Sequence, residues 1–497
     1  MGALPGSHQP ATQNSAVKLA NSPIHPVSPM STPPLVDLNT NSPHSPLERL
    51  GDRTLNLSPA EYGLLTDLYQ LTMTACYVGE KLDQRRASFE LFARRLPQDF
   101  GYLIAMGLEQ ALDYLENFRF SSEQIGALQD TGIFANVPEG FWRLLADASF
   151  TGDVWAVPEG TAVFANEPLL RIEAPLWQAQ IAETYLLNTL NFQTLIATRA
   201  ARLRDAAGPE ATLYEFGTRR AFSPQASLWA ARSALAAGLD ATSNVLAAIK
   251  LGRKPVGTMA HSLVMALAAT EGSEAEAFTA FHRYFPSAPL LIDTYDTIAA
   301  AQQIAEKLQA GEIHLSGVRI DSGDLLSLSQ QVRKLLPDIP IFASGDLDEY
   351  KITALKAAGA CIDGYGLGTQ LVTGPPVNGV YKLVEIDSIP VMKEAPGKAT
   401  YPGRKQIFRS YEQGQVQHDR LGLITESPQN EHSLLQLVMK QGQRTQFPET
   451  LDEIAQRTAQ SIASLPPQTR QVQQPISIPV KSSTELMAMT QKTRNGN

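Results

Sequence analysis

The sequence has only two cysteines, no long apolar run and no excess of positive charge. Cys76 and Cys361 are too few for a disulfide framework or a structural zinc site, so a reducing cytoplasm fits the chain best. No stretch approaches the roughly 18 to 20 apolar residues of a membrane span, because even residues 234–249 include Asp240 and Asn244. The formal net charge of -9 argues against general nucleic-acid binding. We therefore expect neither a membrane nor a nucleic acid as a partner.

Two nucleotide-binding motifs are also missing from the sequence. No GxxxxGKS/T loop occurs, because Pro396-Gly397-Lys398-Ala399 lacks both the first glycine and the final Ser or Thr. No GxGxxG follows a predicted strand either. P-loop and dinucleotide-binding chemistry are therefore not expected, and any phosphate site in this acidic protein must be a local cluster of donors.

Both ends of the 497-residue chain differ in composition from its middle. Residues 1–57 are rich in Pro, Ser, Thr and Asn, and no positive segment is followed by an apolar core. They are predicted to be a disordered tail and not a secretory signal. Residues 459–497 are similarly rich in Gln, Ser, Thr and Pro, and they are predicted to be largely disordered.

The ordered chain is predicted to begin with a helix. Ser58, Pro59 and Glu61 form the pattern of a capping box, and apolar residues follow at helical spacing as far as Met73. Residues 89–94 alternate as a strand does. Helices and strands continue to alternate up to about residue 190, which indicates a mixed α+β region.

From about Thr212, short apolar and β-branched runs alternate with helical stretches. Repeated strand–helix units produce parallel strands, and a parallel sheet covered on both faces either closes into a barrel or is doubly wound. We therefore predict an α/β fold. Six runs end in small, polar or charged residues, which an α/β barrel would gather on its active-site face. These ends lie within residues 213–220, 256–262, 290–297, 317–324, 339–346 and 362–369.

The stretch from Gly317 to Leu325 is the most unusual of these strand ends. Its β-branched residues, Val318 and Ile320, alternate with charged ones. If they pack under helices, Arg319 and Asp321 are turned into the interior. The two charged residues could form an internal salt bridge or face a charged ligand. Six strand ends of this kind favour the ligand, because packing alone does not explain them all.

Other strand ends supply groups that suit phosphate. Gly345, Gly366 and Gly368, with Thr369 after them, resemble a barrel phosphate cradle, in which backbone N–H groups and a helix dipole meet an anion. Charged residues accompany them, and the carboxylates among these could hold magnesium or simply cap helices. They are Arg219, Arg220, Arg319, Asp293, Asp296, Asp321 and Asp346.

His261 stands at a predicted strand end beside Thr258 and Ser262. A lone histidine among apolar residues is usually a satisfied core side chain. Its place on the same predicted face as the arginines favours a nucleophilic or acid–base role instead.

Five motifs in a consistent order resemble the nicotinate phosphoribosyltransferase family over about residues 57–450. Together they form a highly specific signal, whereas any one alone would be modest. The motifs run from Thr66 to Met73, Glu215 to Arg220, Gly257 to Ser262, Gly317 to Asp324 and Gly379 to Leu383.

This resemblance implies that nicotinate, phosphoribosyl pyrophosphate and ATP give nicotinate mononucleotide, pyrophosphate, ADP and phosphate in NAD salvage, with Mg²⁺ as cofactor. It also implies a homodimer with a shared active site. The implied fold is an irregular α/β barrel of parallel strands over residues 191–375. An α+β domain accompanies it, in which residues 376–458 complete residues 58–190.

The resemblance also implies roles for single residues. Phe216 and the partner subunit's Tyr69 would stack on opposite faces of the pyridine. His261 matches the histidine that the family phosphorylates from ATP, and Asp321 with Arg319 would serve the displacement at the ribosyl carbon. No direct metal ligand is assigned. The implied nicotinate contacts are Tyr69, Phe216, Arg219, Thr258, Arg319 and Thr369, and the implied phosphoribosyl pyrophosphate contacts are Asp293, Arg319, Gly345, Asp346, Gly366, Gly368 and Thr369.

Two alternatives remain open at this point. A nicotinamide phosphoribosyltransferase would have a related site and would differ in whether an amide or a carboxylate is bound. A non-catalytic sensor of phosphoribosyl pyrophosphate or nicotinate would be favoured by the loss of His261 or Arg319, and both residues are present.

Overall fold

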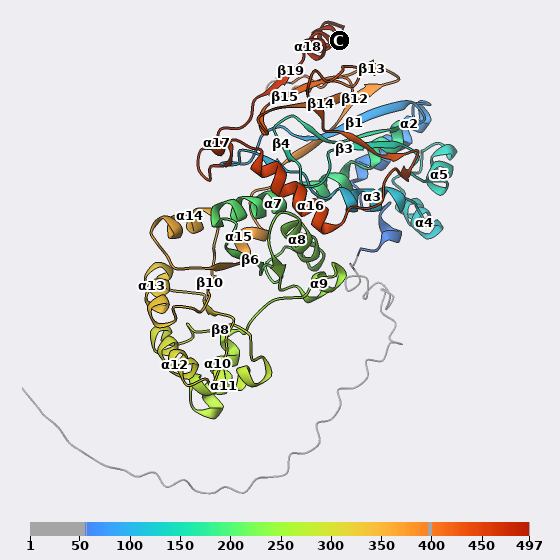
Figure 1. Cartoon of the computed structure of the whole chain (residues 1–497). Coiled ribbons are helices and arrows are strands. Elements are labelled where there is room, and N and C mark those ends of the chain that lie inside the picture. The colour runs from blue at the N-terminus through green and yellow to red at the C-terminus, as the bar shows by residue number, and fades with distance from the viewer. Residues whose placement is uncertain (1–54, 56, 396–399, 497) are drawn as a thin grey trace, which may run out of the picture. The chain divides into compact units, whose positions relative to one another are not determined.

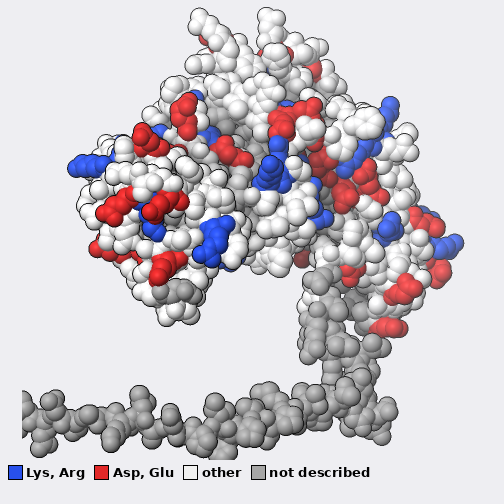
Figure 2. Space-filling model, turned by 60° about the horizontal axis from the view of Figure 1, so that its bottom comes forward, with Lys and Arg blue, Asp and Glu red and all other residues white. Residues whose placement is uncertain are grey.

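The computed structural model describes residue 55 and residues 57–395 and 400–496 (Figure 1). The tail predicted for residues 1–57 therefore lies, except for Leu55 and Leu57, outside the described residues. Within these ranges, no helix has both the length and the apolar character needed to cross a bilayer. Figure 2 shows acidic and basic side chains interspersed on one face, without a continuous basic area on that face.

The first helical segment is shorter than predicted. Ser58 and Glu61 do form the capping box, with the Ser58 amide 2.7 Å from Glu61 Oε2, but only the 3-10 turn η2 (Pro59–Glu61) follows. Helix α2 (Leu68–Gly79) starts separately. The helix is interrupted near Gly63. A Cβ at this position would overlap the backbone carbonyl of Arg119, so the segment packs closely there.

One sheet combines strands from distant parts of the ordered chain (Figure 1). Strand β1 (Arg86–Ala93) is antiparallel to β5 (Pro168–Pro175) on one side and to β12 (Gly379–Ile386) on the other. Its residues after Arg86 are all buried, because β1 lies in the middle of the sheet. The order is β13-β12-β1-β5-β3-β17-β18, with β13 (Ile389–Pro390), β3 (Asp153–Ala156), β17 (Gln436–Lys440) and β18 (Gln443–Arg444).

The second sheet holds six parallel strands in the order β7-β6-β11-β10-β9-β8. The predicted α/β fold with parallel strands is thereby confirmed. No pairing joins β7 to β8 in the described part of the chain, so closure into a barrel stays a prediction. The strands are β6 (Thr212–Glu215), β7 (Ala241–Thr242), β8 (Leu290–Leu291), β9 (Val318–Ile320), β10 (Ile341–Ala343) and β11 (Gly364–Leu367), and the connecting helices are α8 (Pro224–Ala236), α9 (Val245–Lys250), α10 (His261–Glu271), α11 (Glu274–Tyr284), α12 (Thr297–Gln309), α13 (Leu325–Leu335) and α14 (Glu349–Ala357).

One of the six predicted strands is wrong. Residues 253–260 form no strand, and the amide of Val256 donates a single hydrogen bond of 2.9 Å to the carbonyl of Thr242 at the end of β7. The preceding Pro255 has no amide hydrogen, which prevents a ladder from continuing. Strand β7 takes the sixth place in the sheet instead.

Residues 459–496 are folded, so the prediction of a disordered tail from residue 459 is wrong. Helices α16 (Leu451–Ala463) and α17 (Pro467–Arg470) are followed by β19 (Val480–Ser482), which pairs in parallel with β15 (Gln415–Leu423), and by α18 (Thr484–Gly496). Composition misled the prediction because the packing depends on a few apolar residues in a segment that is otherwise rich in Gln, Ser, Thr and Pro. These buried residues are Ile462, Leu465, Ile478 and Leu486.

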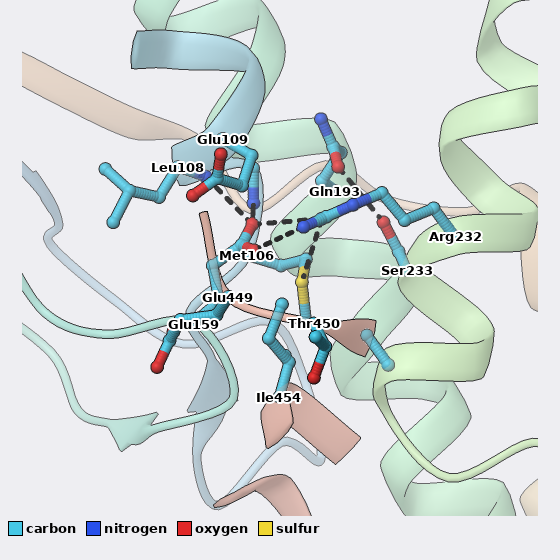
Figure 3. A network of polar contacts seen from close by, with 12 residues as sticks. Met106, Leu108, Glu109, Glu159, Gln193, Arg232, Ser233, Glu449, Thr450 and Ile454 are labelled. Atoms are coloured by element: carbon cyan, nitrogen blue, oxygen red, sulfur yellow. Dashed lines mark hydrogen bonds and ion pairs between the residues drawn. The ribbon is translucent and has the colours of Figure 1, made fainter. Parts of the chain in front are cut away.

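Helix α7 (Glu183–Ala207) contacts β12 and α3 (Leu108–Glu116) as well as α8 and α14, so it packs between the two sheets. The buried carboxylate of Glu159 adds a second connection (Figure 3). It accepts hydrogen bonds from the amides of Gly107 (2.6 Å) and Leu108 (3.0 Å) and from the Arg232 guanidinium (2.6 Å). Burial raises the pKa of Glu159, but the Arg232 charge and these hydrogen bonds bring it below its usual value. The start of α3 is thus tied to α8.

Candidate active site

Strand β9 presents Arg319 on the face opposite to its apolar residues. Val318 and Ile320 are fully buried, whereas Arg319 is partly exposed. Its guanidinium donates hydrogen bonds to the Thr258 hydroxyl (Nη1, 2.9 Å) and to the Met259 carbonyl (Nη2, 3.2 Å). The alternation in the sequence therefore predicted the orientation of the arginine correctly.

Arg319 and Asp321 do not form the internal salt bridge considered as an alternative. Among the described residues, Asp321 accepts a hydrogen bond from the Ser344 hydroxyl instead. Burial lowers the pKa of Arg319, and the charges of Asp321 and Asp293 partly offset that shift. The Arg319 Nε atom is buried without a hydrogen-bond partner in the described ranges. A ligand anion would stabilise this guanidinium.

Arg319 lines a cavity of about 280 Å³. Even a cavity of about 150 Å³ can hold benzene, so a single aromatic ring fits here. Three further predicted residues, Phe216, Thr258 and Gly366, also line it. The rest of the lining is Tyr214, Pro255, Val256, Gly257, Pro289, Ser316 and Phe342.

Aromatic rings form much of the cavity wall. The Phe216 ring packs directly on Gly366, where a Cβ would lie 2.6 Å from the ring. Phe342 fills the space that a Cβ on Gly364 would need, again at 2.6 Å, and stacks on Tyr214 with 5.5 Å between ring centroids. Tyr214 and Phe342 were missed in the sequence, although alternation along β6 places Tyr214 on the same face as Phe216.

His261 begins α10 beside a buried carboxylate. Its Nδ1 lies 3.1 Å from Thr294 Oγ1, and its Nε2 lies 4.0 Å from Asp293 Oδ1. The other oxygen of Asp293 accepts hydrogen bonds from the Asp321 amide (2.9 Å) and the Ser322 hydroxyl (2.7 Å). Oδ1 has no hydrogen-bond partner among the residues described. With its side chain 38% exposed, His261 can be reached by a ligand.

The predicted phosphate cradle has close backbone packing. Gly345 and Asp346 both have positive φ (95° and 55°), and a Cβ on Gly345 would overlap the Asp321 carbonyl. Gly368 precedes α15 (Thr369–Val372), which has only four residues. The dipole of so short a helix is small. An anion at this segment would therefore be bound mainly by backbone amides.

Family models match most of the ordered chain. The nicotinate phosphoribosyltransferase (NAPRTase) N-terminal domain matches residues 64–191, the family itself matches residues 211–343, and the C-terminal domain matches residues 425–490. A nicotinate phosphoribosyltransferase of Mycobacterium tuberculosis is 40% identical over 444 residues, which cover 87% of this chain and 94% of the relative. The chain belongs to the nicotinate phosphoribosyltransferase family.

A second enzyme sequence and a solved crystal structure support this assignment. The nicotinate phosphoribosyltransferase of Bacillus subtilis is 42% identical over 366 residues, covering 70% of this chain and 72% of its own. The crystal structure of human nicotinic acid phosphoribosyltransferase superposes with a TM-score of 0.76 at 29% identity, covering 86% of this chain and 99% of that chain. The fold of this chain is therefore that of the nicotinate phosphoribosyltransferase family.

Three residues that the family resemblance assigned to nicotinate do not line the cavity within one chain. Tyr69 lies on α2 with 47% of its surface exposed, and its hydroxyl donates a hydrogen bond to Glu183 (3.3 Å). Arg219 is exposed in the turn after β6, and Thr369 begins α15.

Glu274 is a nearby acidic residue that the sequence did not indicate. It occupies the first turn of α11 behind the capping Ser273, which is an ordinary place for a glutamate. Burial, together with the charges of Asp293 and Asp296, raises the pKa of Glu274 to about 7. It therefore adds a carboxyl group that titrates near neutral pH to this part of the site.

Proposed function

We propose that the protein transfers the phosphoribosyl group of phosphoribosyl pyrophosphate to nicotinate in NAD salvage, forming nicotinate mononucleotide and pyrophosphate. The observation that best supports this is the fixed, partly buried guanidinium of Arg319 in the wall of an aromatic cavity. The pyridine ring of nicotinate suits the aromatic wall, and its carboxylate suits the guanidinium. A carboxamide would leave the cation without a counter-charge, so nicotinamide should be the poorer substrate.

The displacement forms a bond from the pyridine nitrogen to the ribosyl C1 while the bond from C1 to the pyrophosphate oxygen breaks. Phe216 and Arg319 would hold the ring nitrogen in line with C1. The carboxylate of Asp321 would stabilise the positive charge that develops on the ribosyl group. The phosphoribosyl and pyrophosphate groups would be bound by the backbone around the remaining predicted residues. These are Gly345, Asp346, Gly366, Gly368 and Thr369.

Magnesium would enter this site together with pyrophosphate. In the described ranges, no three His, Cys, Asp or Glu side chains are grouped as a complete protein site would require. Mg²⁺ is commonly held by one or two carboxylates together with substrate phosphates and water. The unpartnered Oδ1 of Asp293 fits the carboxylate part of such a set. When bound, the ion would neutralise charge on the leaving group.

His261 would couple ATP to this reaction. Its Nε2 attacks the γ-phosphorus of ATP, and the new N–P bond replaces the P–O bond to ADP, which leaves. Water later breaks the N–P bond and releases phosphate. Thr294 at Nδ1 would orient the ring, and Asp293, with Oδ1 4.0 Å from Nε2, would stabilise the positive charge that the ring acquires as the N–P bond forms.

A homodimer in the cytoplasm would complete the site. Tyr69 and the adjacent Leu68 are both exposed on α2, so they are accessible to a second chain. The partner subunit's Tyr69 would cover the open face of the base that Phe216 stacks on. The free Cys76 and Cys361 suit a reducing compartment.

One assay tests the proposed reaction. The purified protein is given phosphoribosyl pyrophosphate and Mg²⁺ with either nicotinate or nicotinamide, with and without ATP, and the mononucleotides are separated by chromatography. The proposal is supported if the protein converts nicotinate and does so faster when ATP is present. Turnover of nicotinamide alone would identify the amide-specific enzyme instead. No turnover of either base, with phosphoribosyl pyrophosphate still bound in calorimetry, would indicate a sensor.

A further inference from the structure

A single carboxylate gathers polar groups from helix α2, from the helix Leu176–Ile181 and from strand β12. Glu183, the first residue of α7, accepts hydrogen bonds at Oε2 from the side-chain amides of Gln70 (2.9 Å) and Gln180 (3.2 Å) and from the Tyr69 hydroxyl (3.3 Å). Its Oε1 lies 3.5 Å from the ammonium of Lys382. The Glu183 side chain is 12% exposed, so this charge is largely buried.

The Glu183 carboxylate has other polar partners besides the tyrosine. The Lys382 ammonium supplies the counter-charge, and the two glutamine amides already satisfy Oε2. Tyr69 differs from these partners because its ring is 47% exposed, next to Leu68, which is 51% exposed. The hydrogen bond to Glu183 therefore orients an aromatic ring that projects from an apolar, exposed helix face.

We infer that Glu183 is a positioning residue, which holds the Tyr69 ring in the orientation that enters the aromatic cavity of a second copy of this chain. The inference rests on the proposed function, because that cavity is the proposed nicotinate site. Tyr69 touches the substrate, whereas Glu183 acts only through Tyr69. Fixing the ring before binding removes the entropy cost of ordering it over the base.

This role predicts a particular kinetic pattern. Stacking holds the base equally well in the ground state and the transition state, so its loss raises KM for nicotinate and leaves kcat almost unchanged. We expect Glu183→Gln to raise this KM by about 10-fold with kcat within about twofold, because a neutral amide oxygen replaces the charged acceptor of the Tyr69 hydroxyl.

A double-mutant cycle separates positioning from general damage. Tyr69→Phe keeps the exposed ring and removes its hydroxyl, so it should fold normally and raise KM for nicotinate as Glu183→Gln does. Combining the two changes should add little, because both act on the same hydrogen bond: Tyr69→Phe removes its donor, and the neutral amide of glutamine is a weaker acceptor than the carboxylate. Independent effects that multiply, or a Tyr69→Phe variant with the KM of the wild type, would overturn the inference.

Asp419→Asn is the matched control for this cycle. Asp419 is a fully buried carboxylate in β15 that pairs with Arg409 at 2.6 Å, in a different sheet from the strand that carries Lys382. Its substitution should lower the melting temperature without changing KM for nicotinate. An equal rise in KM for Asp419→Asn would show that lost stability, and not positioning, explains the result for Glu183.

Hybrid dimers test whether Glu183 acts across subunits. Chains with Glu183→Ala and chains with Phe216→Ala are co-expressed with different affinity tags, and the hybrids are purified over both. Activity is measured at nicotinate well below KM, where the variants are impaired. If the action is across subunits, each hybrid keeps one intact site and recovers about half of the wild-type activity of a symmetric dimer. Tyr69→Ala with Phe216→Ala serves as the reference pair.

The two pairs distinguish the possible failures. Recovery in both pairs supports the inference. Recovery in the reference pair alone would overturn the role of Glu183 and leave the shared site standing. Recovery in neither pair would refute the shared site of the proposed function, and the inference with it.

Discussion

Nε2 of His261 lies 4.0 Å from Oδ1 of Asp293, and the other oxygen of that carboxylate is held by the Asp321 amide and the Ser322 hydroxyl. The oxygen that faces the imidazole is therefore fixed in direction although it has no hydrogen-bond partner among the described residues. A carboxylate in this place can stabilise the positive charge that the imidazole acquires when its Nε2 bonds to phosphorus.

Asp293→Asn should slow ATP hydrolysis by roughly 10- to 100-fold, because an amide does not stabilise a positive imidazole. ADP release in a coupled assay measures the effect. Asp324→Asn is the matched control, since Asp324 is exposed and caps α13, and asparagine caps helices equally well. Equal slowing in the two variants would contradict the role of Asp293.

Thr258→Val should raise KM for nicotinate by about 5- to 20-fold, because Arg319 loses a hydrogen bond to its guanidinium. Thr258→Ser keeps the hydroxyl and should remain close to the wild type. Initial rates at varied nicotinate give both constants. If serine fails to restore KM, the methyl group of Thr258 and not its hydroxyl would be what matters.

Gly366→Ala should displace the Phe216 ring, because the new Cβ would lie 2.6 Å from it. We expect weaker nicotinate binding in calorimetry and a lower melting temperature. Gly126→Ala is the contrasting change, since Gly126 lies in a helix with no atom within 4 Å of the added carbon. It should be neutral or stabilising by up to ~1 kcal/mol. Unchanged nicotinate binding in Gly366→Ala would show that Phe216 does not stack on the base.

Glu274→Gln should change how stability depends on pH. Because the pKa of Glu274 is raised to about 7 in the folded protein, the folded state retains this proton more strongly than the unfolded chain, whose glutamates titrate near about 4.3. The wild type therefore loses stability as pH rises from about 4.3 to about 7, whereas the glutamine variant is spared this loss.

Urea unfolding at several pH values between 5 and 8 measures the difference between the two proteins. The free energy of unfolding of Glu274→Gln should increase relative to that of the wild type as pH rises. Glu276→Gln, an exposed position on the same helical turn, serves as the control and should follow the wild-type profile. A difference that does not vary with pH would show that Glu274 ionises as an ordinary surface glutamate.

The local pattern around β9 predicted much of the candidate site. Alternation placed Val318 and Ile320 in the core and turned Arg319 away from them, and the resemblance placed Phe216 and Thr258 in the same pocket. Phe342 and the partners of His261 could not be predicted in this way. Their positions depend on which strands lie side by side, and a strand alone does not contain that information.

Two errors have different physical origins. Val256 has the β-branched side chain of a strand residue, but the proline before it removes the amide that a ladder would use. Leu486 lies in a segment of mostly polar composition, yet it is completely buried because α18 packs on β15. The first error was visible in the adjacent residue, whereas the second depends on a partner distant in sequence, which composition does not reveal.

The position of β1 between β5 and β12 has a consequence during synthesis. One edge of β1 is without its native partner until residues 379–386 have left the ribosome. At roughly 5–20 residues per second, this wait lasts on the order of tens of seconds. During it, a largely apolar strand edge is open to pairing with other chains. Nascent chains of this protein are therefore more exposed to aggregation than the finished fold would indicate.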